Sequence, residues 1–95
     1  MQEDILNLVN KVYKKEKITY DQFIFLIQNG YEMQFYYKNR KFGSTQFDGF
    51  EFYEWNKDEG YQSYKTIEEF GNKINIDGKF LKDLWNDVSN VDFAD

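Results

Sequence analysis

The chain of 95 residues contains no cysteine, no histidine and no proline. Without cysteine it has no disulfide framework, no thiolate nucleophile and no sulfur ligand for a metal. Without histidine it also lacks the side chain that most often serves as a general base or a metal ligand near neutral pH. These absences exclude most familiar catalytic sites, and we predict that the protein is not an enzyme.

Glycine and long apolar runs are also scarce. The six glycines are spread along the chain, which excludes a glycine-rich loop that cradles phosphate. The most apolar segment, residues 23–27, is far shorter than a membrane span. The N-terminus carries Glu3 and Asp4 where a signal peptide needs positive charge. We therefore expect a cytoplasmic protein that has no membrane partner.

Aromatic residues, in contrast, are abundant. Ten Phe, eight Tyr and two Trp make up 21% of the chain, enough large rings to fill a small core. We expect one domain over residues 1–95. Seventeen acidic residues against twelve basic ones give a net charge of -5, which disfavours a protein that binds nucleic acid by neutralising phosphates.

Two amphipathic helices are expected within residues 1–30. From 5 to 13 the apolar residues recur at i, i+3, i+4 and i+7, the pattern of one helix face. Thr19 and Gln22 have the spacing of a capping box, and the short apolar stripe that follows them would end at Gly30. The N-terminal third is therefore predicted to be a helical pair.

The next segment, 31–65, has the composition of an antiparallel sheet. Lys38-Asn39 and Asp48-Gly49 suit two-residue hairpin turns between strands rich in aromatic residues. If both turns form, Phe35 pairs with Phe42, and Phe42 pairs with Trp55. Residues 61–65 then add a short fourth strand or an extended segment.

That register divides the side chains between two faces of the sheet. Trp55 and Tyr53 fall on the face that we expect to be covered by helices, together with Met33 and Ser44. The opposite face is unusually aromatic for one that meets solvent. Its members are Tyr36, Lys41, Thr45, Phe47, Phe50 and Phe52, beside Glu32 and Glu54. A slip of one residue would exchange the two faces.

The C-terminal third is predicted to be helical over residues 66–88 and to end in a tail over 89–95. Thr66 and Glu69 form a second capping-box pattern. Asp77 is expected to cap a last helix that carries Trp85 in its apolar stripe. The whole chain thus predicts an α+β fold, a three- or four-stranded antiparallel meander covered on one face by helices, in the order ααβββ(β)αα.

Four segments of this pattern resemble a group of short uncharacterised proteins of Gram-positive Firmicutes and their prophages. They are the turn strand 32–39, the aromatic strand 49–56, the capped helix 64–70 and the C-terminal segment 76–88. The similarity covers residues 31–88, so the N-terminal helical pair lies outside it. The resemblance implies no activity, but it associates the chain with prophages.

Carboxylates are the remaining candidates for metal or acid chemistry. Asp83 and Asp87 are spaced at i, i+4, and Glu68 is adjacent to Glu69, so either pair could offer oxygen ligands. A calcium loop with acids at alternate positions is absent, and acids on a helix surface usually serve solubility. We therefore predict no catalytic residue, no metal and no cofactor.

The function favoured by the sequence is a small acidic domain that binds a protein partner. The candidate binding residues are Tyr36, Phe47, Phe50 and Phe52 on the second sheet face, with Asp83 and Asp87 as an acidic contribution. The prophage association suggests a host-directed inhibitor that counters host defence, with carboxylates that imitate nucleic-acid phosphates.

An alternative is a reader of single-stranded nucleic acid. Such a protein would stack bases on the same rings and bind the nucleic-acid backbone with Lys38, Arg40 and Lys41. The neighbouring acidic residues would repel that backbone. The sequence leaves the partner's identity and the oligomeric state open.

Overall fold

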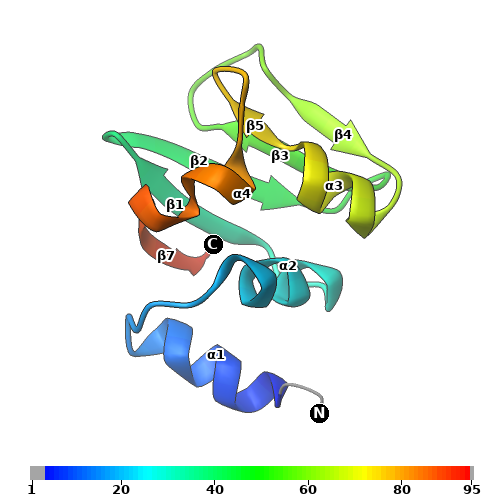
Figure 1. Ribbon diagram of the computed structural model, residues 1–95. Coiled ribbons are helices and arrows are strands. Elements are labelled where there is room, and N and C mark those ends of the chain that lie inside the picture. Colours follow the sequence, from blue (N-terminus) through cyan, green and yellow to red (C-terminus); the bar gives the residue numbers. More distant parts are fainter. Residues whose placement is uncertain (1–3, 95) are drawn as a thin grey trace.

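The computed structural model describes residues 4–94, which form four α-helices, a five-stranded antiparallel sheet and a small hairpin (Figure 1). The elements are α1 (Ile5–Tyr13), α2 (Tyr20–Gln28), β1 (Met33–Tyr37), β2 (Arg40–Thr45), β3 (Phe50–Glu54), β4 (Gln62–Tyr64), α3 (Ile67–Lys73), β5 (Asn75–Ile76), β6 (Lys79–Phe80), α4 (Leu81–Leu84), the 3-10 turn η1 (Trp85–Asp87) and β7 (Ser89–Phe93). The α+β class and the antiparallel meander predicted from the sequence are confirmed.

The two N-terminal helices form as predicted. The side chain of Thr19 accepts the N–H of Gln22, whose own side chain accepts the N–H of Thr19, and this capping box starts α2. The helix ends at Gln28, and Gly30, with a φ of +94°, turns the chain so that Tyr31 donates back to the carbonyl of Leu26. That hydrogen bond satisfies a carbonyl that the end of the helix would otherwise leave unpaired.

In the large sheet the strands follow the order β4-β3-β2-β1-β7. The first hairpin has the predicted register, with Phe35 opposite Phe42. Lys38 and Asn39 adopt φ values of +50° and +64°, as the central residues of a type I′ turn require.

The second hairpin differs from the prediction by one residue. Phe42 lies opposite Glu54 and not Trp55. The reason is the buried carboxylate of Glu51, which accepts the backbone N–H groups of Phe47 at 2.8 Å and Asp48 at 3.4 Å. These bonds stabilise a longer loop in place of the two-residue turn, and the slip moves every β3 side chain to the other face.

Two further expectations for the C-terminal third are wrong. Asp77 does not cap a helix: with Gly78 it forms the turn of the β5–β6 hairpin, both residues at positive φ. The chain therefore enters α4 only at Leu81, after Phe80. The segment expected to be a tail contains β7, which pairs with β1 because its apolar residues Val91 and Phe93 join the partly buried layer around the core.

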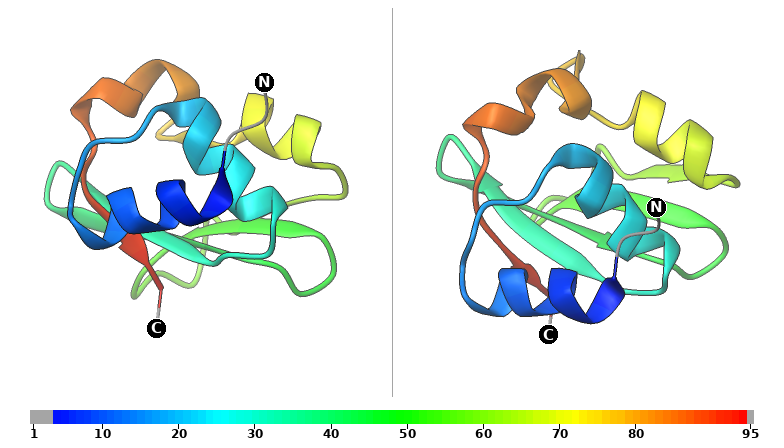
Figure 2. Two further views of the ribbon diagram at one scale, coloured as in Figure 1. Left: turned by 90° about the horizontal axis from the view of Figure 1, so that it is seen from below. Right: turned by 60° about the horizontal axis from the view of Figure 1, so that its bottom comes forward.

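The helices α2, α3 and α4 lie on the same face of the large sheet, and α1 lies beside β7 (Figure 2). Between the layers, Trp85 packs against Phe23 with ring centroids 4.5 Å apart and against Phe35 at 5.8 Å. The indole N–H of Trp85 donates to the carbonyl of Ile18 at 2.9 Å, so its polar atom is satisfied inside the core.

Across residues 4–94, every helix is too short or too polar to cross a membrane.

Candidate interaction surface

The face of the sheet turned away from α2, α3 and α4 carries a cluster of aromatic side chains, which we call the open face. The observed register produces it, because residues paired across antiparallel strands point to the same side. Tyr36 pairs with Lys41, the N–H of Trp55 donates to the carbonyl of Lys41, and Gly43 pairs with Tyr53. The open face consists of Tyr36, Lys41, Gly43, Tyr53, Trp55 and Tyr61.

Gly43 lies at the centre of the open face and allows the rings to lie close to the sheet. A Cβ atom at this position would come within 2.9 Å of the Tyr53 hydroxyl oxygen and 3.0 Å of the Trp55 Nε1 atom. Both side chains therefore occupy the space above Gly43. Trp55 Nε1 is buried there, and within the described chain it has no hydrogen-bond partner.

Three rings follow one another at similar spacings. The Tyr53 centroid is 6.2 Å from that of Trp55 and 6.5 Å from that of Tyr61, and the Tyr53 and Tyr61 rings are nearly parallel at 17°. Tyr61 is 58% exposed, while Tyr53 and Trp55 are half-buried. The rings thus form an aromatic platform that solvent still reaches.

Few charges border this platform. The ammonium group of Lys41 lies over the Trp55 ring, and the Glu32 carboxylate accepts the hydroxyl of Thr45 at 2.6 Å. Partial burial, followed by the electrostatic influence of Glu32 and then of Tyr61, raises the pKa of Tyr53. Partial burial and the charge of Glu51 also raise the pKa of Tyr61. Both phenols are therefore neutral hydrogen-bond donors at neutral pH.

The aromatic residues predicted from the sequence to bind a partner are not all on this face. Tyr36 lies on the open face, and Phe47 is 93% exposed on the β2–β3 loop. Phe52 is instead 1% exposed and stacks on Phe42, and Phe50 is half-buried against Phe70. The expectation that Phe50 and Phe52 lie on a solvent-facing surface is wrong, because the one-residue slip turns them toward the helices.

The same slip exposes residues that the sequence argument assigned to the core face. Tyr53 and Trp55 belong to the open face, and Tyr61, which had no assigned role, extends it. A signal for the correct register exists in the sequence. The observed register, unlike the predicted one, places Arg40 and Glu54 on one face, where opposite charges can pair.

Asp83 and Asp87 lie elsewhere. Both are exposed on the α4 and η1 segment of the helical layer, across the molecule from the open face (Figure 2). The aromatic and acidic residues predicted to act together therefore belong to two separate surfaces. Two other C-terminal acids already have ion-pair partners, Asp77 with Arg40 and Asp92 with Lys15.

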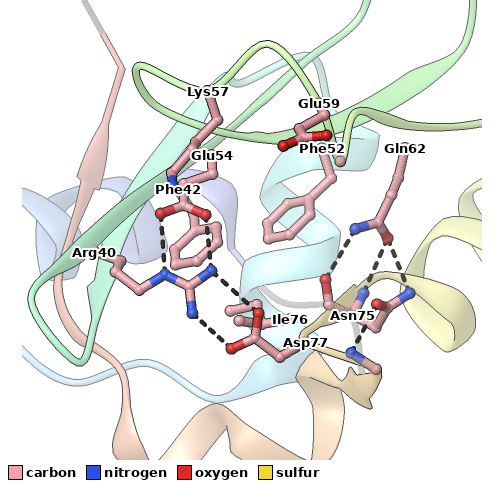
Figure 3. A pocket seen from close by; sticks show the side chains of 12 residues that line it. Arg40, Phe42, Phe52, Glu54, Lys57, Glu59, Gln62, Asn75, Ile76 and Asp77 are labelled. Carbon is pink, nitrogen blue, oxygen red and sulfur yellow. Dashed lines mark hydrogen bonds and ion pairs between the residues drawn. The ribbon is translucent and has the colours of Figure 1, made fainter.

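A second surface feature is a pocket of about 430 Å³ between β3, β4 and the β5–β6 hairpin (Figure 3). Arg40 crosses it and donates to Glu54 at 2.8 and 3.0 Å and to Asp77 at 2.6 and 3.2 Å. These hydrogen bonds lower the pKa of both carboxyl groups and raise that of the guanidinium. Gln62 and Asn75 similarly pair with each other through two hydrogen bonds between side chain and backbone.

The polar side chains of this pocket are thus mainly occupied with one another. Arg40 also lies over the ring of Phe42, with 5.4 Å between the guanidinium carbon and the ring centroid. The arrangement attaches the hairpin to the sheet, and we regard the pocket as structural. Within residues 4–94, no group of three or more acidic side chains is placed to hold a metal ion.

Comparison of the chain with protein-family models, with curated proteins and with solved structures gives no match in any of the three.

Proposed function

We propose that the protein is a non-enzymatic interaction domain that binds a protein partner through the open face. The observation that carries the proposal is the platform of Tyr53 and Trp55, packed over Gly43, with the ring of Tyr61 beside Tyr53. Tyrosine and tryptophan contribute large contact areas at low entropic cost, and they are enriched among the residues that dominate protein interfaces.

The electrostatics of the open face also favour a protein over a polyanion. Its cation, Lys41, lies on the Trp55 ring, and the neighbouring Glu32 carries the opposite charge. An apolar centre with few charges is the usual composition of an interface core. We further propose that the domain acts in the cytoplasm.

The resemblance to prophage proteins supports a narrower version, in which the partner is a host protein that the domain inhibits. Nucleic-acid mimicry would then use Asp83 and Asp87, the exposed acids of the helical layer. Replacing both with lysine should weaken such a complex, and raising the salt concentration should weaken the wild-type complex in the same way. A complex that both treatments leave unchanged would exclude mimicry.

The main proposal is tested by capturing partners from a lysate of a Gram-positive host with the tagged protein. Tyr61→Ala should release a specific partner, since removing an interface ring often costs about 2 kcal/mol or more of binding. Tyr13→Ala is the matched control, because Tyr13 is an exposed tyrosine on α1 whose ring contacts Phe93 and not the open face, and its urea midpoint checks that the variant stays folded. Equal partner recovery with both variants would contradict the proposal.

Single-stranded nucleic acid is a second candidate ligand for the same face. This candidate is favoured by the observed positions of two acidic residues that were expected from the sequence to lie among the rings. Glu54 points to the opposite face and pairs with Arg40, while Glu51 is buried against the β2–β3 loop. Stacking of bases on Tyr53 and Trp55 would then meet the charge of Glu32 but not that of Glu54. Titration with oligothymidine at low salt tests it, and saturable binding that Tyr61→Ala abolishes would support it.

A further inference from the structure

The loop between β2 and β3 carries Phe47, which is 93% exposed, more than any other large apolar side chain of residues 4–94. A single exposed ring is common on protein surfaces and by itself indicates nothing. Phe47 differs because its backbone is held by a buried charge. The platform of the open face does not account for this arrangement, since Phe47 is not one of its rings.

Two contacts hold this loop in place. The carboxylate of Glu51, which is 2% exposed, accepts the N–H groups of Phe47 at 2.8 Å and Asp48 at 3.4 Å. The side-chain amide of Gln46 donates to the carbonyl of Ile27 near the end of α2. Burial of a carboxylate costs free energy unless hydrogen bonds replace those it made with water, so the buried charge and the loop conformation depend on each other.

The position of Glu51 places the loop beside the open face. Glu51 pairs with Thr45 on β2 and with Ser63 on β4, and the hydroxyl of Ser63 donates to its carboxylate at 3.2 Å. Tyr53 lies two residues further along β3, and side chains at i and i+2 share a face of a sheet. Partial burial, followed by the charge of Glu51, raises the pKa of Tyr61. The loop that rests on Glu51 is therefore continuous with the aromatic platform.

We propose that Glu51 is a positioning residue, which holds Phe47 in place as an anchor for an apolar pocket of the protein partner. This inference rests on the proposed function and extends the same binding surface by one ring. A two-residue turn at 48–49 would join the strands without a buried carboxylate, and departures from the simplest local solution are expected mainly at functional sites. A ring held in one position loses less conformational entropy on binding than a mobile one, and a phenyl ring is complemented by apolar surroundings.

The positioning role is tested first in the isolated full-length protein. Glu51→Gln keeps the shape of the side chain, but its amide nitrogen cannot accept a hydrogen bond. We expect the amide proton of Phe47 or of Asp48 to exchange at least about tenfold faster in this variant, while the NMR shifts of the open face stay unchanged. Ser63→Ala removes one hydrogen bond from the carboxylate and should raise the exchange rate by a smaller factor, which provides a second comparison if Glu51→Gln does not fold. Exchange rates equal to those of wild type would overturn the role of Glu51.

The anchor is tested by calorimetry. The probe is the protein that the tagged domain captures from a Gram-positive lysate, purified after its identification by mass spectrometry. Phe47→Ala should weaken this complex by about tenfold or more, and Phe47→Leu, which keeps an apolar side chain, should recover most of the affinity. Leu6→Ala is the matched control, because Leu6 is an apolar side chain 68% exposed on α1, and it should leave the affinity unchanged.

A double-mutant cycle separates positioning from a general structural effect. Glu51→Gln should weaken the complex by about threefold or more when Phe47 is present, and it should have no further effect in combination with Phe47→Ala. Additive effects would mean that Glu51 supports the sheet as a whole, and they would overturn the inference. Wild-type affinity of Phe47→Ala, or the absence of any protein that wild type retains, would also overturn it.

Tyr61→Ala, measured in parallel, distinguishes failure of this inference from failure of the proposed function. If Tyr61→Ala weakens the complex and Phe47→Ala does not, the platform binds the partner without the loop, and only the inference fails. If Phe47→Ala weakens the complex and Tyr61→Ala does not, Phe47 is an anchor but the proposed role of the open face fails. If neither variant weakens it, both fail.

Discussion

The ammonium group of Lys41 lies 4.0 Å from the centroid of the Trp55 ring, on the face of the sheet that carries no helix of the described chain. An exposed cation over tryptophan typically contributes about 0.5–1 kcal/mol. The contact holds two long side chains in place before any ligand arrives. A surface arranged in advance loses less conformational entropy when it binds, and this makes Trp55 and its neighbours better suited to recognition than mobile side chains would be.

The first prediction concerns Gly43→Ala. The new methyl group would lie 2.9 Å from the Tyr53 hydroxyl oxygen and 3.0 Å from Trp55 Nε1, so both rings must shift outward. The displaced atoms are the ends of side chains, and we expect the free energy of unfolding to change by less than about 1 kcal/mol. Binding through the open face should be lost. Urea denaturation and partner capture measure the two effects, and retained binding would show that the ring positions are unimportant.

The second prediction compares two phenylalanines that the sequence alone placed on one surface. Phe52→Ala should lower the free energy of unfolding by about 3–5 kcal/mol, because it removes a ring that is 1% exposed and stacked on Phe42. Phe47→Ala should change it by no more than about 0.5 kcal/mol, since that ring is 93% exposed. Similar denaturation midpoints for the two variants would contradict the observed register.

The contrast between these residues shows which features a sequence can predict. Periodicity and capping boxes are local, so α1, α2 and the Thr19 cap were predictable, as was the type I′ turn that pairs Phe35 with Phe42. The β2–β3 register depends on Glu51, which must fold back on the loop before the pairing is decided. Reading Asp48-Gly49 as a two-residue turn therefore exchanged the faces.

The C-terminal errors have a similar cause. The pattern Asp77-Gly78 suits a helix cap and a hairpin turn equally well, and the choice is made by Arg40, which is 37 residues away in sequence. The strand β7 has a weak apolar pattern of its own. It forms because it can pair with the edge of β1 and because Phe93 packs against the rings of Tyr31 and Tyr13. Long-range partners of this kind are invisible to local patterns.

The third prediction concerns Trp85, a residue that the sequence correctly placed in the core. Trp85→Ala should cost about 3–5 kcal/mol, because it empties a site in contact with Phe23 and Phe35. Trp85→Phe keeps most of the apolar volume but leaves the Ile18 carbonyl without its donor, so a smaller loss of about 1–3 kcal/mol is expected. Asp83→Ala, on the exposed side of α4, is the control and should change little. Urea midpoints that rank these variants differently would place Trp85 outside the core.

The last prediction is a pH dependence that Arg40 creates. Its hydrogen bonds lower the pKa of Glu54 and of Asp77 in the folded protein, whereas in the unfolded chain both groups return to their ordinary values of about 4. Below that pH the unfolded state binds more protons than the folded state, so the free energy of unfolding falls as the solution is acidified. The stabilisation is fully present above the ordinary pKa values and is lost as pH falls through the lowered ones.

Replacing Arg40 should remove this contribution to the pH dependence of the free energy of unfolding. We expect Arg40→Gln to be less stable than wild type at pH 7, and the difference between the two proteins to shrink steadily between about pH 5 and pH 2. Asp77→Asn should remove only part of this pH dependence, because Glu54 keeps its two hydrogen bonds to Arg40. Lys41→Gln is the charge-matched control, since Lys41 lies over the Trp55 ring, and its difference from wild type should not change across this pH range. Urea midpoints measured at half-unit pH intervals test this prediction. A constant difference in stability between wild type and Arg40→Gln across this range would mean that Arg40 does not lower the pKa of the two carboxyl groups.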